Sequence, residues 1–121
     1  MPLIVYIPLW FLIPFTSWTC GEVWGAYVPM KDQIYICEQQ PNEKHIIRHE
    51  TGHRVWIKEL DDTQREKYKK AFQNSNFRYS SVEEDFAEVY TMKTHKNKEI
   101  RKRIFLIKQL WLNSSHITRV P

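Results

Sequence analysis

Apolar and polar residues follow different periods in the two parts of the chain. Before residue 40, short runs rich in β-branched and aromatic residues predict strands at 3–7, 23–28 and 33–37, the last two joined by a turn at 29–32. Three strands are roughly the fewest that form a stable sheet. We therefore expect a small twisted β-sheet in the N-terminal part.

After residue 40 the apolar residues recur every three or four positions, which predicts helices. Asn42 and Asn97 are the expected N-caps of the first and fourth helices. The third helix is expected to begin with a capping box, in which the Glu83 side chain reaches back to the Ser80 amide. The predicted helices span 43–60, 63–72, 81–94 and 98–112.

Length and composition are those of one ordinary soluble domain. The chain has 121 residues, of which 42% are hydrophobic and 26% are charged. We expect a single domain over residues 1–121, with a tail at 113–121. The elements together predict an α+β fold in which a small sheet of about three strands packs on the first helix, with about three further helices.

Two features bear on the cellular setting. Residues 1–15 are almost wholly apolar, but Lys31 is the first basic residue and three prolines interrupt the stretch, so neither a signal peptide nor a membrane anchor is expected. Cys20 and Cys37 do not form a Cys-x-x-Cys pair. We expect reduced thiols in a cytoplasmic protein, with a disulfide or a metal-bound thiol as the alternatives.

The formal net charge of the chain is +4, and much of the excess lies in its last third. The basic residues of the predicted fourth helix, with Trp111 nearby, are Lys98, Arg101, Lys102, Arg103 and Lys108. A solvated basic helix face is the simplest interpretation of this run. The alternative is a surface that binds nucleic acid.

A candidate metal site lies in the first predicted helix. His49 and His53 are four residues apart, so both imidazoles project from one face of the helix and can bind one Zn²⁺ or another divalent ion. Glu50 lies beside them, where it can take a proton from a zinc-activated water and pass it to a leaving amine. Because Gly52 weakens a helix, we expect another element to approach closely there.

A catalytic zinc site needs a third protein ligand. Glu84 and Glu88 share one face of the third predicted helix, and we expect Glu84 to bind the metal while Glu88 accepts a hydrogen bond from a ligand histidine. Asp85 is expected to point away from the metal and to add favourable charge at the helix N-terminus. The alternative third ligands are Glu88 itself, His95 and His116.

Two further features suit peptide hydrolysis. Tyr79, on the connection before the third helix, is the best-placed donor for a tetrahedral oxyanion, although an ordinary structural tyrosine fits the same position. The strand at 34–37 precedes the metal helix, and its edge would align an extended peptide by strand addition. A plain structural strand is the alternative.

These residues resemble the gluzincins, zinc peptidases that combine His-Glu-x-x-His on one helix with a glutamate on a later helix. The closer resemblance is to the minigluzins, minimal soluble archaeal metallopeptidases that share their pattern with the catalytic domain of anthrax lethal factor. The segments that carry it are Ile34-Tyr35-Ile36, His49-Glu50-Thr51-Gly52-His53 and Glu84-Asp85-Phe86-Ala87-Glu88. The order of elements around them extends the resemblance over residues 3–111.

The resemblance implies a zincin-like fold, with Glu84 as the third zinc ligand, Glu50 as the base and Glu88 as a supporting acid. The family often has a tyrosine seven residues before the ligand glutamate, where this chain has Phe77. Members can be latent, which implies self-inhibition or self-association through chain ends such as 114–121.

We therefore expect a zinc-dependent endopeptidase that acts on peptides or unfolded proteins, with no membrane partner and no nucleic-acid partner. The alternative is a zinc-stabilised, non-catalytic module that binds nucleic acid through the basic run.

Overall fold

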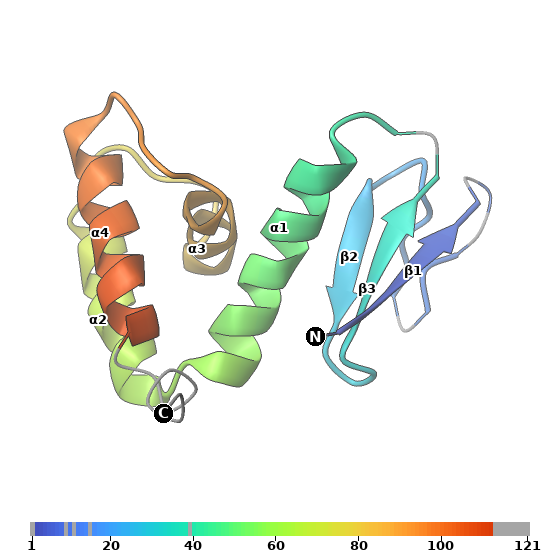
Figure 1. Cartoon of the computed structure of the whole chain (residues 1–121), viewed down its shortest axis with the longest axis horizontal. Coiled ribbons are helices and arrows are strands. Elements are labelled where there is room, and N and C mark those ends of the chain that lie inside the picture. Colours follow the sequence, from blue (N-terminus) through green and yellow to red (C-terminus); the bar gives the residue numbers. More distant parts are fainter. Residues whose placement is uncertain (1, 9, 11, 15, 39, 113–121) are drawn as a thin grey trace.

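The computed structural model describes residues 2–8, 10, 12–14, 16–38 and 40–112 and shows an α+β fold (Figure 1). The strands are β1 (Leu3–Ile7), β2 (Gly25–Val28) and β3 (Gln33–Cys37), in the sheet order β1-β3-β2. β3 pairs in parallel with β1 and antiparallel with β2. The predicted three-stranded sheet is confirmed, although β2 begins later than predicted.

The four predicted helices are confirmed. They are α1 (Glu43–Arg54), α2 (Asp62–Gln73), α3 (Val82–Tyr90) and α4 (Lys98–Leu112), and a π-helical segment, η1 (Val55–Glu59), continues α1. α3 ends before the predicted residue 94. Within the described part of the chain, no helix is both long and apolar enough to cross a bilayer.

The helix N-termini agree only in part with the predicted caps. The Asn97 side chain accepts hydrogen bonds from two backbone amides in the first turn of α4, as expected. Asn42 occupies the N-cap position of α1 in the left-handed conformation, but its side chain makes no capping bond. The predicted capping box of α3 was wrong. Ser81, rather than the serine before it, caps this helix by accepting from the Glu84 amide, so Glu83 is one position too early to take part.

The central strand is buried on both faces. Ile34 and Ile36 pack with Ile46 of α1, while Tyr35 and Cys37 face residues of the segment between β1 and β2. This explains the uninterrupted apolar run of β3. Because β1 and β2 occupy both edges of β3, the prediction that this strand offers a free edge was wrong. The sheet edge beside α1 is β2.

α1 lies between the sheet and the other three helices (Figure 1). One side of α1 packs on the sheet. A hydrophobic cluster that joins the helices, called the helical cluster below, begins at η1, directly after α1. The helical cluster comprises Val55, Trp56, Leu60, Tyr68, Phe86, Val89, Ile100, Ile104, Ile107 and Leu110. The predicted apolar stripe of α4 is therefore confirmed, except that the side chain of Trp111 lies outside the described residues. Packing on both sides gives α1 a fixed position.

α3 packs closely against α1 at Gly52. A Cβ added to Gly52 would lie 2.8 Å from the Ala87 Cα and 3.0 Å from the Ala87 carbonyl oxygen. The expected close approach is confirmed. It brings the acidic face of α3, with Glu84 and Glu88, within reach of the histidines of α1.

Gly52→Ala is expected to destabilise the fold by about 2 kcal/mol. Overpacking against backbone costs up to about 3 kcal/mol, and the better helix propensity of alanine returns about 1 kcal/mol. Urea unfolding measures the change. Gly21→Ala is the matched control, because a Cβ there meets only an ordinary contact at 3.7 Å. Equal midpoints for the two variants would show that α3 does not need this close approach.

Cys20 and Cys37 form a disulfide, so the prediction of reduced thiols was wrong. The bond joins the end of β3 to the segment between β1 and β2, and both cysteines are buried. Sequence spacing carried no sign of it, because the two residues meet only when this segment folds over the sheet. The disulfide therefore fastens the covering of one sheet face.

The Cys20→Ser/Cys37→Ser double variant is expected to lose about 3 kcal/mol of stability, the usual contribution of a disulfide that closes a loop of about this length, because the two cysteines are 17 residues apart. Urea unfolding of the oxidised protein and of the variant measures the difference. A reducing agent should move the wild-type midpoint toward that of the variant and leave the variant unchanged. A wild-type unfolding midpoint that stays unchanged when the reducing agent is added would contradict the expectation.

Asp85 and Arg103 form a buried ion pair between α3 and α4, with side chains 0% and 1% exposed. Arg103 Nε and Nη2 donate to the two Asp85 oxygens at 2.9 and 3.0 Å. The Tyr68 hydroxyl donates to the same carboxylate at 2.6 Å. Asp85 points away from the histidines, as expected, whereas the interpretation of Arg103 as part of a solvated basic face was wrong. Their geometry and extra hydrogen bonds offset the cost of burial.

Candidate metal centre

His49, His53 and Glu84 converge between α1 and α3. His49 Nε2 lies 3.2 Å from Glu84 Oε1, and His53 Nε2 lies 2.7 Å from Glu84 Oε2. One donor atom from each residue lies within 4.8 Å of the others. The four-residue spacing on α1 sets the two imidazoles side by side, with ring centroids 4.9 Å apart. The structure thus contains a three-residue group with metal-binding geometry.

The group fits a zinc ion. Tetrahedral zinc with bonds of about 2.1 Å holds its ligand atoms about 3.4 Å apart. The 3.2 Å between His49 and Glu84 is near this spacing, whereas the 2.7 Å between His53 and Glu84 is a hydrogen-bond distance that would widen to admit an ion. Two imidazoles and a carboxylate are a known catalytic donor set that leaves one coordination position open. The imidazoles are each 18% exposed and the Glu84 side chain 45% exposed, so the group faces solvent on one side. An ion therefore has access to it.

Charge within the group favours the metal-binding form of the carboxylate. Burial opposes the charged form of His49, but hydrogen bonds to Glu84 and Glu88 outweigh it and raise the pKa of His49 to about 10. Hydrogen bonds from His49 and His53 hold the pKa of Glu84 well below its usual range. A cation at this point would replace the imidazole protons as the partner of Glu84.

Glu50 is held against the edge of the sheet. Its Oε1 accepts a hydrogen bond from the Tyr27 amide of β2 at 3.0 Å, and the residue is only 8% exposed. Burial raises the pKa of the Glu50 carboxyl above its ordinary value. A buried carboxylate of raised pKa beside the ligand group has the properties of a general base.

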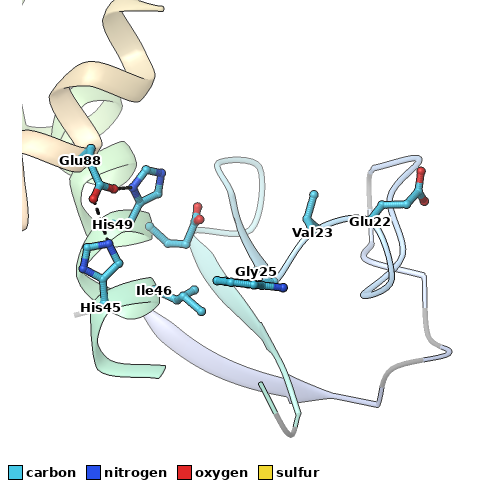
Figure 2. A pocket seen from close by; sticks show the side chains of 9 residues that line it. Glu22, Val23, Gly25, His45, Ile46, His49 and Glu88 are labelled. Atoms are coloured by element: carbon cyan, nitrogen blue, oxygen red, sulfur yellow. Dashed lines mark hydrogen bonds and ion pairs between the residues drawn. The ribbon is translucent and has the colours of Figure 1, made fainter. Parts of the chain in front are cut away.

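Glu88 lies one turn after Glu84 and makes two contacts with α1. Its Oε2 lies 2.8 Å from His49 Nδ1, the nitrogen on the far side of the ring from Glu84. Its Oε1 lies 3.0 Å from His45 Nε2 (Figure 2). The expected hydrogen bond between Glu88 and a histidine of the pair is present. His45 was not predicted from the sequence, although its four-residue spacing from His49 is visible there.

Tyr79 lies just before α3, and its backbone amide donates to Asp85 Oδ1 at 3.1 Å. Burial, and then the negative charges of Glu88 and Asp85, raise the pKa of its phenol. Its part as an oxyanion donor stays a prediction. Of the alternative ligands, His95 accepts a hydrogen bond in the turn before α4 and is not part of the three-residue group. His116 lies outside the described residues.

Two hollows flank the three-residue group along β2. One, of about 350 Å³, lies beside His49 (Figure 2), and the other, of about 400 Å³, lies beside His53. They share Val23, Gly25 and Glu50 in their walls. The two hollows therefore adjoin each other beside the candidate metal centre. The segment fastened by the disulfide supplies part of both walls.

Comparison of the chain with protein-family models, curated proteins and solved structures finds no match. The function must therefore be inferred from the geometry of the site.

Proposed function

We propose that the chain is a zinc-dependent endopeptidase of the gluzincin type with a zincin-like fold. The observation that carries the proposal is the convergence of His49, His53 and Glu84 beside the buried Glu50. Two imidazoles and a candidate base from one helix, with a carboxylate from a later helix, are the parts that such a peptidase needs.

Each residue has a defined part in hydrolysis. His49, His53 and Glu84 hold the ion, and a zinc ion bound there supplies Lewis acidity toward a carbonyl group and a water molecule. Glu50 accepts the proton of the attacking water and returns it to the leaving amine. Tyr79 donates a hydrogen bond to the oxyanion.

The proposed substrate is an extended peptide, such as a segment of an unfolded protein. The Cys37 amide donates to the Trp24 carbonyl, so the alternation of antiparallel pairing turns the backbone groups of Gly25 and Tyr27 away from β3. The Tyr27 amide is bonded to Glu50, whereas Gly25 lies where the two hollows meet. A peptide that pairs with β2 there would pass the candidate metal centre.

The test is removal and return of the metal. The purified chain loaded with zinc is expected to bind one ion per chain and to cleave casein. A chelator should abolish cleavage, and added zinc should restore it. Zinc binding without cleavage of casein or of short unstructured peptides would contradict the proposal, as would cleavage that survives complete removal of metal.

Latency and location stay predictions. The segment 114–121, expected to inhibit the site, lies outside the described residues. The cytoplasmic location was predicted partly from reduced thiols, and the disulfide removes that support, because such bonds persist mainly in oxidising compartments.

The second candidate is a zinc-stabilised module that binds nucleic acid. The exposed face of α4 favours it, because Phe105 there is 62% exposed among the basic residues Lys98, Arg101, Lys102 and Lys108. With Arg103 buried, this run is shorter than the sequence indicated. Steeply salt-dependent DNA binding by a metal-loaded chain that cleaves no peptide would favour this candidate over the peptidase.

A further inference from the structure

His45 forms the outer end of a row of three side chains that leads to the candidate metal centre. It lies one turn before His49 on α1, so both imidazoles project from the same face of the helix. Glu88 of α3 lies between them, with one oxygen 3.0 Å from His45 Nε2 and the other 2.8 Å from His49 Nδ1 (Figure 2). Nothing in the proposed hydrolysis uses His45.

The row restricts the orientation of Glu88. A glutamate side chain that holds a single hydrogen bond can rotate about several bonds, and ordering it costs entropy. In this chain the second oxygen is also bonded, so the carboxylate plane is set by two histidines of one helix. Glu88 accepts a hydrogen bond from Nδ1 of His49, so Nε2, the nitrogen nearest Glu84, is the one that would give up its proton to bind an ion.

We propose that His45 is a positioning residue of the metal centre and acts through Glu88 to hold His49 in its metal-binding tautomer and orientation. The proposal rests on the proposed function only in requiring zinc at His49, His53 and Glu84. Two other readings predict different results. In the first, His45 and Glu88 form a partly solvated ion pair that contributes nothing to zinc binding, since the His45 side chain is 42% exposed. In the second, His45 contacts the ion directly.

The test compares two replacements of His45 in the full chain. His45→Leu removes the donor, whereas His45→Gln keeps an amide nitrogen at about the distance of Nε2 from the backbone. Zinc affinity is measured without substrate, by competition with a chromogenic chelator. His45→Leu is expected to weaken zinc binding about 3- to 10-fold, less than the roughly 10- to 100-fold expected for Glu88→Ala, and His45→Gln should restore most of the loss. His95→Leu, which removes a histidine outside the group, should have no effect.

A double-mutant cycle identifies the route of the effect. If His45 acts through Glu88, His45→Leu changes nothing further in the Glu88→Ala background. An equal loss in both backgrounds would overturn the proposal in favour of direct contact with the ion. No loss in the wild-type background would overturn it in favour of a solvated ion pair.

The metal-free proteins control for a purely structural effect. Thermal unfolding without metal should be the same for the wild type and His45→Leu, because the expected loss concerns the ion. A matching loss of stability in the metal-free chain would overturn the positioning role. A chain that binds zinc and obeys the cycle but cleaves no peptide would contradict the proposed function alone, whereas a wild type without zinc affinity would overturn both.

Discussion

Glu50→Gln is expected to lower the rate of peptide cleavage by about 10²- to 10⁴-fold, the usual contribution of general acid–base catalysis. The glutamine oxygen can still accept the hydrogen bond from the Tyr27 amide, so the side chain should keep its place at the sheet edge. The amide cannot take a proton from water at neutral pH, and the three proposed metal ligands are unchanged. The measurement is the initial rate of casein hydrolysis at equal zinc content, together with that zinc content.

Glu43→Gln provides the matched control for this prediction. It makes the same chemical change on the same helix, but at the exposed first turn of α1 and outside the three-residue group. Full activity is expected for it. Two results for Glu50→Gln would count against the assignment: unimpaired cleavage would show that another group moves the proton, and loss of zinc would show that Glu50 helps to hold the ion.

The elements of the fold could be predicted from the sequence because their signals are local. The β-branched run 33–37 and the stripe at Ile100, Ile104 and Ile107 report the period of the element that contains them. Strand order is a different matter. The position of β3 between β1 and β2 depends on contacts between distant segments, so the predicted free edge could not be checked against the sequence alone. The prediction of the α3 cap was wrong for a local reason, because Ser80 and Ser81 are both serines and so are equally good N-cap residues.

The candidate site likewise has some features that local sequence signals predicted and others that they did not. The spacing of His49 and His53 decides by itself that they share a face, and the glycine at position 52 predicted the close packing that admits α3. The arrival of Glu84 could be expected only from the order of elements and the resemblance. The disulfide had no local signal. The burial of Arg103 did have a local signal, since this residue lies beside the apolar stripe of α4, but its charge favoured a surface position.

The buried ion pair between α3 and α4 helps to fix the orientation of α3, and so the geometry of the candidate site on another face of that helix. Glu84 and Glu88 face α1, while Asp85, on another face of α3, is bonded to Arg103 of α4. These bonds oppose rotation of α3 about its own axis. The Asp85 carboxylate also accepts from the Tyr79 amide, so the connection before α3 is held by the same group. Removing Asp85 should therefore affect both stability and metal binding.

Asp85→Ala is expected to cost about 3–5 kcal/mol, because it leaves the Arg103 charge buried without a partner. Urea unfolding of the metal-free chain measures this loss, and chelator competition should show weaker zinc binding. Asp62→Asn breaks the ion pair of a fully exposed aspartate with Arg65 and should leave both measurements unchanged. Asp85→Leu/Arg103→Met, which removes both charges, should be less destabilised than Asp85→Ala. If the double replacement were the less stable of the two, loss of the carboxylate, rather than the unpaired guanidinium, would account for most of the lost stability. The orientation of α3 would then depend on the bonds of that carboxylate to Tyr68 and Tyr79.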